Sequence, residues 1–398
     1  MRALLLENLH PLATTLLRTD GIDVTSRTGA LDEDELGAAL AGVQVLGIRS
    51  KTQVTAEVLD QAPDLLAIGA FCIGTNQIDL TAAAERGIAV FNAPFSNTRS
   101  VVELALAEIL SLTRRMTVLD KALHAGVWDK SADGAHEVRG RTLGIVGYGN
   151  IGTQLSVLAE ALGMSVVFYD SAEKLALGNA RRLTSLDELL EVADVVTLHV
   201  DGRSGNAGLF GPAQFAKMRP GSVFLNLSRG FVVDYAGLRE HILSGHLAGA
   251  AVDVYPVEPK RRGDAFESEL RELPNVILTP HIGGSTEEAQ EAIGQFVATK
   301  LRDYLLHGAT MLSPNLPPLA LEATSGSHRL THLHRNTPGV LAGINRVFAE
   351  HDVNIEAQML GTRGDLGYVV TDVAAPLGPE VCTALRTMPQ TIRLRTLS

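Results

Sequence analysis

Short, almost uninterrupted apolar segments alternate with amphipathic ones over most of the chain. Continuous apolar segments are typical of parallel strands that are buried on both faces. Patterns with helical periodicity lie between them, for example at 100–116 and 151–163. This alternation predicts an α/β doubly wound architecture. The opening MRALLLENL is a further strand candidate, and the other predicted strands are 43–48, 65–71, 88–92, 143–149, 165–170, 194–200, 222–227, 247–254 and 275–281.

Two helix starts are predicted from capping-box spacing, in which a serine precedes a glutamate by three residues. Ser185 and Glu188 form one such pair, and Ser285 and Glu288 form the other. The second pair is expected to open a long helix that runs to about Leu306.

The last part of the chain has a different pattern. Residues 313–327 concentrate Pro, Ser and Gly, which is typical of a linker. Residues 328–398 then form a small module of the order βαββαβ, which predicts a ferredoxin-like fold. Its expected elements are strands at 329–334, 353–361, 366–373 and 391–396 and helices at 338–350 and 379–387.

Composition limits the functional classes. The 398 residues are 45% hydrophobic and 20% charged, which is ordinary for a soluble enzyme of two or three domains. The net charge of −11 argues against nonspecific nucleic-acid binding, and no apolar run approaches membrane-spanning length. Cys72 and Cys382 are far apart, which indicates neither a disulfide framework nor a zinc site. We therefore expect a reduced, cytoplasmic setting.

A dinucleotide-binding motif follows the strand at 143–149. Gly147, Gly149 and Gly152 form G-x-G-x-x-G between a strand and a helix, a context that the motif requires. The helix N-terminus would face the pyrophosphate. Asp170 ends the next strand, where a carboxylate binds the adenosine ribose and repels a 2′-phosphate. Because Ser171 offers no cation, the sequence favours NAD over NADP.

Three polar residues follow the carboxyl ends of apolar strands, the edge where open α/β sheets bind ligands. They are Arg229 in LNLSRG, Glu258 in DVYPVEP and His281 in TPHIGG. For hydride exchange with a 2-hydroxy acid, a guanidinium suits the carboxylate, an imidazole takes the hydroxyl proton, and a carboxylate orients the imidazole. Singly, the three could be a surface ion pair, a solvated loop charge and a helix cap. Together, beside a nucleotide motif, they indicate catalysis.

These motifs carry a family resemblance. GRTLGIVGYGNIG, LNLSRG, DVYPVEP and NVILTPHIGGSTEEAQ resemble the D-isomer-specific 2-hydroxyacid dehydrogenases, as do GIRSKT, FCIGTNQIDL and FNAPFSNTRSV in the first part of the chain. The resemblance covers essentially the whole sequence. It implies Arg229, Glu258 and His281 as the catalytic residues.

The resemblance also implies a domain layout. A flavodoxin-like substrate domain (1–95, completed by 283–313) would receive an inserted Rossmann-type NAD domain (96–282). Hydride transfer would occur in the cleft between them. A linker (314–327) would lead to the regulatory domain (328–398).

Cofactor and substrate residues carry over from the family motifs. One departure from the family pattern is HVDGRSGNAG (199–208), where relatives usually have Pro after His-Val, which leaves the loop shape near the cofactor open. Trp128, the chain's single tryptophan, is interpreted as a packing or cofactor-edge residue. The implied cofactor residues are Gly147, Gly149, Asn150, Ile151, Gly152, Asp170, His199 and Asp253, and the implied substrate residues are Arg49, Ser50, Lys51, Gly74 and Asn97.

The implied reaction is oxidation of D-3-phosphoglycerate to 3-phosphohydroxypyruvate with NAD. Arg49-Ser50-Lys51 follows a strand in an acidic protein, and its charged and hydroxyl groups suit a phosphate, although an exposed loop pair is the plainer explanation. One alternative is another D-2-hydroxyacid dehydrogenase, such as a glyoxylate/hydroxypyruvate reductase. A second is an NAD-sensing corepressor, which the intact catalytic set argues against.

The tail HLHRNTPGVL with DVNI resembles the ACT ligand-binding domain of amino-acid biosynthetic enzymes. His334, Asn336 and Asn354 match positions that hold an effector amino acid, implied to be L-serine, between two such domains. The chain is therefore expected to form a homo-oligomer, and the family pattern implies a tetramer. Metal binding by His332 and His334 is the competing idea, but no third ligand is nearby. A purely structural dimerisation module is the other alternative.

Overall fold

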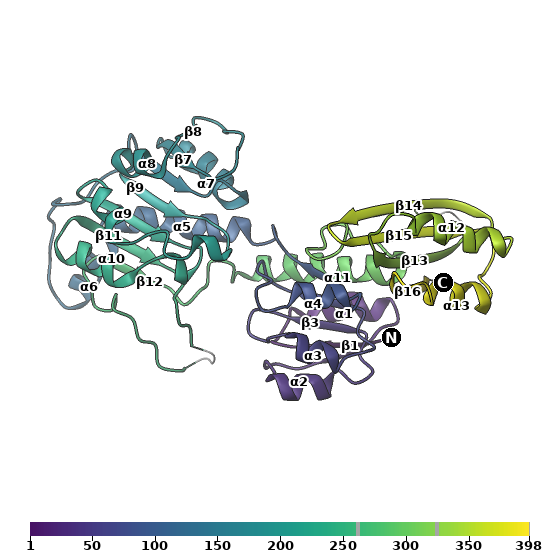
Figure 1. Ribbon diagram of the computed structural model, residues 1–398. Helices are drawn as coiled ribbons and strands as arrows, with labels where there is room; N and C mark the ends of the chain where they lie inside the picture. The colour runs from purple at the N-terminus through teal and green to yellow at the C-terminus, as the bar shows by residue number, and fades with distance from the viewer. Residues whose placement is uncertain (260–262, 323–325, 398) are drawn as a thin grey trace. The chain divides into compact units, whose positions relative to one another are not determined.

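The computed structural model describes residues 1–259, 263–322 and 326–397. The chain divides into two compact units, which are described separately. The central unit comprises 97–289 and the terminal unit comprises 1–96 with 290–398 (Figure 1). No described helix is long and apolar enough to cross a membrane.

The central unit contains a seven-stranded parallel sheet among its described residues. The strand order β12-β11-β10-β9-β6-β7-β8 is that of a Rossmann fold. Starting from β6, the chain adds strands first on one side, β7 and β8, and then on the other, from β9 to β12. The strands are β6 (Thr142–Val146), β7 (Ser165–Tyr169), β8 (Arg181–Arg182), β9 (Val195–Leu198), β10 (Ser222–Asn226), β11 (Leu247–Val252) and β12 (Val276–Leu278).

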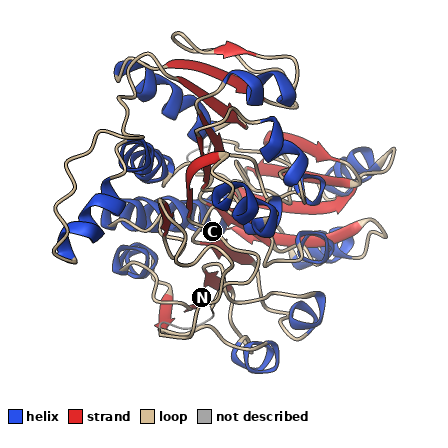
Figure 2. Cartoon of the chain, turned by 90° about the vertical axis from the view of Figure 1, so that its left-hand side faces the viewer, coloured by secondary structure: helices blue, strands red, loops and turns tan. Residues whose placement is uncertain are grey.

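Helices cover both faces of this sheet (Figure 2). Alternate residues of each strand enter two apolar clusters, one under α5 and α7 and the other under α8, α9 and α10, because successive side chains point to opposite faces. The helices are α5 (Thr98–Thr113), α6 (Met116–His124), α7 (Asn150–Ala161), α8 (Leu186–Val192), α9 (Pro212–Lys217) and α10 (Tyr235–Leu243).

The terminal unit begins with a five-stranded parallel sheet of order β2-β1-β3-β4-β5, the flavodoxin-like order. Its two faces lie in separate apolar clusters, one shared with α1 and α11 and the other with α2, α3 and α4. The elements are β1 (Arg2–Leu5), α1 (Pro11–Thr19), β2 (Asp23–Ser26), α2 (Glu33–Ala39), β3 (Val45–Ile48), α3 (Ala56–Asp60), β4 (Ala67–Ala70), α4 (Leu80–Glu85), β5 (Ala89–Asn92) and α11 (Glu287–His307).

The rest of the terminal unit is a four-stranded antiparallel sheet of order β14-β15-β13-β16 with two helices on one face. This is the βαββαβ arrangement predicted from the sequence, so the ferredoxin-like prediction is confirmed. The elements are β13 (His328–Arg335), α12 (Val340–Glu350), β14 (Ile355–Arg363), β15 (Leu366–Val373), α13 (Pro379–Arg386) and β16 (Thr391–Leu397).

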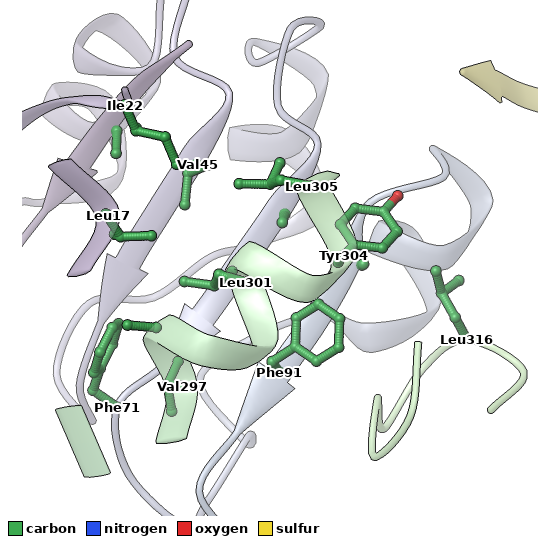
Figure 3. Packing of buried hydrophobic residues seen from close by; sticks show 14 of the residues in the cluster. Leu17, Ile22, Val45, Phe71, Phe91, Val297, Leu301, Tyr304, Leu305 and Leu316 are labelled. Carbon is green, nitrogen blue, oxygen red and sulfur yellow. The ribbon is translucent and has the colours of Figure 1, made fainter. Parts of the chain in front are cut away.

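Helix α11 belongs to the core that both sheets of the terminal unit share. Leu301, Tyr304 and Leu305 pack with residues of the parallel sheet, such as Val45 and Phe91 (Figure 3). The same apolar cluster includes Tyr368 of β15. The Tyr368 hydroxyl donates a hydrogen bond to the backbone oxygen of Gly308 (2.8 Å). Part of the predicted linker joins this core, because Leu316 and Leu319 are buried there, whereas 323–325 lie outside the described residues.

The fold confirms the α/β prediction, and each predicted strand is found, with its ends shifted by a few residues. Two helix predictions were wrong in detail. The helix predicted at 100–116 ends at Thr113, because Arg115 has φ 54° and separates α5 from α6. The start predicted at Ser285 is replaced by Thr286, whose Oγ1 accepts from the N–H of Ala289 (3.2 Å).

Candidate active site

The glycine loop joins β6 to α7. Gly147 has φ +94°, and a Cβ there would lie 2.6 Å from the backbone oxygen of His199. A Cβ on Gly152 would collide with the backbone oxygen of Gly147, whereas one on Gly149 would stand in open space. Gly147 and Gly152 therefore allow the tight turn and the close packing of helix and strand. Gly149 leaves room for a ligand at the N-terminus of α7, beside Asn150 and Ile151.

Asp170 follows β7 at the same edge of the sheet. Its Oδ2 accepts from the N–H of Tyr148 (2.8 Å) and its Oδ1 from the N–H of Ala172 (2.8 Å). These bonds fix the carboxylate beside the glycine loop and leave each oxygen a lone pair for a ribose hydroxyl. The residues therefore fit a dinucleotide.

His199 is held neutral. Burial lowers its pKa to about 3, because an imidazolium would lose its hydration. Its Nε2 is 3.0 Å from Thr197 Oγ1, and the buried Nδ1 has no protein partner. This unpartnered nitrogen next to the glycine loop is available for a hydrogen bond to a ligand.

Arg229 follows β10, and its loop is held by a buried polar network. Asn226 Nδ2 donates to the Arg229 backbone oxygen (3.0 Å) and to the Tyr235 hydroxyl oxygen (3.0 Å). A side chain on Gly230 would collide with the peptide of Tyr255, so glycine allows this loop to lie against the segment that carries Glu258. The half-buried Arg229 is thus fixed near the second predicted catalytic residue.

His281 and Glu258 contact each other directly. His281 Nδ1 lies 3.0 Å from Oε1 and 2.9 Å from Oε2 of Glu258. Burial pushes the pKa of Glu258 upward. The hydrogen bond and charge of His281, the N–H of Tyr255 and the charge of Arg229 outweigh it, so the pKa lies below its usual value. The carboxylate is therefore anionic, and because it bonds to Nδ1, it leaves Nε2 of the imidazole available for proton exchange.

Asp253 positions the turn that carries His281. His281 has φ 54°, a left-handed conformation that non-glycine residues adopt only when neighbours hold it. The Asp253 carboxylate accepts from Thr279 Oγ1 (2.6 Å), Ile282 N (2.8 Å) and Gly283 N (2.8 Å). The family resemblance implies that Asp253 binds the cofactor. In the structure this residue is 2% exposed, and its side chain bonds to the turn around His281.

A second buried carboxyl group lies behind Asp253. Glu108 of α5 is 3% exposed, and neither carboxyl oxygen has a hydrogen-bond partner. Burial raises its pKa to about 8, with a further contribution from the charge of Asp253. Glu108 is therefore neutral at pH 7. The sequence pattern did not single it out, since a glutamate in an amphipathic helix is usually solvated.

In the terminal unit, the 49–51 loop after β3 is held by Glu7. The Glu7 carboxylate accepts from the N–H groups of Lys51 (3.1 Å) and Thr52 (2.9 Å). Arg49 is half-buried, and Ser50 is exposed. Gln77 Nε2 donates to the backbone oxygens of Arg49 (2.6 Å) and Gly74 (3.3 Å), so the structure brings these two predicted substrate residues together. The anchoring role of Glu7 was missed from the sequence.

Asn97 lies in the central unit at the start of α5. A Cβ on Gly284 would collide with the Asn97 amide, and the buried Asn97 Oδ1 has no partner. The amide therefore packs against the segment that follows His281.

The predicted effector residues divide into two places. His334 pairs with Gly367 at one end of β15, and Asn336 Nδ2 donates to the backbone oxygen of Gly364 (3.1 Å). Asn354 precedes β14 and accepts from Ala374 at the opposite end of the sheet. The structure therefore brings His334 and Asn336 together but not Asn354.

The two tail histidines are buried and uncharged. Burial lowers the pKa of His332 to about 4, with a contribution from His334, and also lowers the pKa of His334. His332 Nε2 bonds to Thr391 Oγ1 (2.7 Å), whereas His334 Nε2 is buried without a partner. Among the described residues, no group of three or more metal-ligating side chains is assembled.

Comparison with known proteins agrees with this geometry. Residues 106–283 match the family described as D-isomer specific 2-hydroxyacid dehydrogenase, NAD binding domain, and residues 330–393 match the AHAS small subunit-like ACT domain. The D-3-phosphoglycerate dehydrogenases of Haemophilus influenzae and Escherichia coli are 49% and 48% identical to the chain, over 100% of it and 97% of each relative.

Solved structures show the same fold. TT0316 from Thermus thermophilus is 33% identical with a TM-score of 0.70, and covers 77% of this chain and 97% of its own. D-lactate dehydrogenase from Aquifex aeolicus, complexed with NAD and lactic acid, is 25% identical with a TM-score of 0.67, over 76% of this chain and 95% of its own.

The Rossmann sheet and its glycine loop define an NAD-dependent oxidoreductase. The chain belongs to the D-isomer-specific 2-hydroxyacid dehydrogenase family, in the group of the D-3-phosphoglycerate dehydrogenases, and it carries a C-terminal ACT domain.

Proposed function

We propose that the chain oxidises D-3-phosphoglycerate to 3-phosphohydroxypyruvate with NAD, the first step of L-serine biosynthesis in the cytoplasm. The observation that carries the proposal is the His281–Glu258 pair at the strand edge that also bears the glycine loop. Nearly full-length similarity to named D-3-phosphoglycerate dehydrogenases supports the choice of substrate.

Each catalytic residue has a physical role in this proposal. Bound NAD supplies the acceptor for the hydride that leaves C2. His281 takes the hydroxyl proton, and Glu258 stabilises the imidazolium that forms. The Arg229 guanidinium binds the carboxylate and polarises the C2 oxygen. In the reverse direction, the imidazolium returns the proton to the keto oxygen.

The proposed phosphate site is the 49–51 loop. Its backbone is fixed by Glu7, which supports presentation of Arg49, Ser50 and Lys51 in one arrangement. A charge-assisted hydrogen bond to phosphate is stronger than a neutral one. Selection of a phosphorylated substrate would follow from this loop.

Replacing Arg49 by Ala is expected to raise KM for 3-phosphohydroxypyruvate by roughly 10–100-fold, the loss of one charge-assisted hydrogen bond. KM for unphosphorylated hydroxypyruvate should change little. Oxidation of NADH, followed by its absorbance, measures both. Arg86→Ala, which removes a cation paired with Asp60, is the control. Equal changes in KM for the two keto acids in Arg49→Ala would favour a general D-2-hydroxyacid dehydrogenase. Absence of turnover by the native protein would refute the enzymatic proposal.

We also propose L-serine as an effector bound between the ACT domains of two chains. His334 and Asn336 supply one half, and Asn354 of a second chain supplies the other. The separation of Asn354 from the first two residues supports a site that needs two copies. Strand β14 lies at the edge of its sheet and exposes Met359 and Leu360, as an edge that pairs with another copy would.

Asn336→Ala and Asn354→Ala are each expected to abolish serine inhibition. An oligomer that contains both variants should recover part of the inhibition. A pair of one chain of each variant has two effector sites, and at one of them both asparagines are native. The measurement is NADH oxidation with and without L-serine. Asn345→Ala, in the same domain, is the control. Failure of mixing to restore inhibition would exclude a shared site.

We propose that the chain forms a homotetramer. The central unit offers a second surface through which chains could associate. Met116, Leu123, Val127 and Trp128 are exposed apolar residues on α6 and the segment after it. Clusters of this kind mark interaction surfaces. Trp128 is 80% exposed, which contradicts its interpretation as a packing residue within the chain, and the cofactor-edge alternative stays a prediction.

A further inference from the structure

The loop after β9 departs from the family pattern, and it holds one arginine in place. Asp201 Oδ1 accepts from Arg203 N (3.3 Å) and Nε (2.7 Å), and Oδ2 accepts from Nη2 (2.6 Å). Asn206 Nδ2 donates to the Asp201 backbone oxygen and to Oδ1 (2.9 Å each). Arg203 is therefore oriented although its side chain is 63% exposed.

This loop borders the cofactor crevice. β9 and β6 are adjacent, and the strand order reverses between them, which is where Rossmann folds bind dinucleotides. The loop begins against the glycine loop, since a Cβ on Gly147 would contact His199 and Val200. A Cβ on Gly202 would lie 3.3 Å from Arg229 Nε, so the loop continues past the catalytic arginine.

A second arginine lies at the ribose end of the crevice. Arg182 of β8 donates from Nη2 to the backbone oxygens of Asp170 and Ala172 (3.3 Å each). It thus spans the turn that carries the predicted ribose-binding carboxylate. The pKa of Arg203 is raised mainly by the hydrogen bond and charge of Asp201, and the charge of Asp170 makes a smaller contribution, so the guanidinium lies within electrostatic range of this carboxylate.

These two cations change the electrostatic balance of the ribose site. A lone carboxylate repels a 2′-phosphate, and a nearby arginine accommodates it. Counted together, Asp170, Asp201, Arg182 and Arg203 have no net charge. The sequence argument for NAD considered only Ser171, but the cations come from β8 and from the loop after β9. Guanidinium forks match phosphate oxygens bidentately.

We propose that Arg182 and Arg203 form a binding site for the 2′-phosphate of NADP(H), so that the enzyme takes NADP(H) as a second coenzyme beside NAD(H). Arg182 approaches from the side of β7, and Arg203 approaches from the loop after β9. The 2′-phosphate exchanges with Asp201 as the partner of Arg203.

Equilibrium binding of NADH and NADPH to the full chain, followed by reduced-nicotinamide fluorescence, tests this without any substrate. The native protein should bind NADPH within about 30-fold of its Kd for NADH. Arg182→Ala and Arg203→Ala should each weaken NADPH about 10-fold, as loss of a charge-assisted bond does, and change NADH less than about threefold. Asp170→Ser should tighten NADPH, and adding Arg203→Ala should remove that gain.

The matched control is Arg139→Ala. Arg139 pairs with Glu137 two residues away and is exposed, as Arg203 pairs with Asp201, and its removal should affect neither coenzyme. Arg203→Lys keeps the charge without the fork and should give an intermediate NADPH Kd. Absence of saturable NADPH binding, or equal weakening of both coenzymes by the arginine variants, would overturn the proposal. Because binding is measured, this outcome is independent of the substrate assignment.

Discussion

Replacing His281 by Ala is expected to lower kcat for NADH oxidation with 3-phosphohydroxypyruvate by roughly 10²–10⁴-fold, the usual contribution of a general acid–base group. No other imidazole is bonded to Glu258 in the described residues. Glu258→Gln should also lower kcat, because a neutral amide cannot stabilise the imidazolium. NADH binding should persist in both variants, since neither residue belongs to the glycine loop.

Steady-state kinetics and NADH fluorescence titration separate these effects. His136→Ala, which removes an exposed histidine of the same unit, is the control and should leave kcat unchanged. If His281→Ala kept its turnover, the proton acceptor would have to be another group. If the variant lost NADH binding, His281 would be a cofactor residue.

Replacing Glu108 by Gln should stabilise the protein increasingly as the pH rises. The folded protein keeps a proton on Glu108 up to about pH 8, whereas the unfolded chain releases it near 4.5. The folded state therefore binds more protons in this window, so native stability falls as pH rises through it. Gln carries no titrating proton and avoids this loss. At about 1.4 kcal/mol per pKa unit, the advantage of the variant should grow on the order of 4 kcal/mol between about pH 5 and about pH 9.

Thermal melting at several pH values measures this difference. Glu103→Gln is the matched control, because Glu103 lies on the same helix and pairs with Arg99 at the surface. Its effect should be small and should not grow with pH. A Glu108→Gln curve parallel to that of the native protein would mean that Glu108 is ionised in the folded state.

Much of the fold could be predicted because most of its strands are short, almost uninterrupted apolar segments, which are typical of parallel strands that are buried on both faces. β2 and β8 could not. Asp23–Ser26 and Arg181–Arg182 lie at or near sheet edges, are short, and expose most of their side chains. These two segments are strands because they form hydrogen bonds with β1 and β7. The local sequence gives no signal of that pairing.

The same distinction applies to the site. Arg229, Glu258 and His281 could be predicted because a charged residue at the end of an apolar strand is a local signal. Glu7 bonds to the 51–52 backbone and Arg182 bonds to the backbone of Asp170, both of which are distant in the sequence. Nothing beside Glu7 or Arg182 in the sequence therefore indicates these contacts. Glu108 is distinguished only by burial, which depends on the packing of α5 against the sheet.

Helix α11 has a consequence for how the ACT domain could be gained or lost. One face of the antiparallel sheet, including Leu333 and Tyr368, shares a core with Leu301 and Tyr304 of this helix. A version of the enzyme without the ACT domain would need a new polar surface on α11, not merely an earlier stop codon. A simple deletion of the ACT domain would therefore expose apolar residues of α11, so it would not cleanly separate catalysis from the proposed feedback.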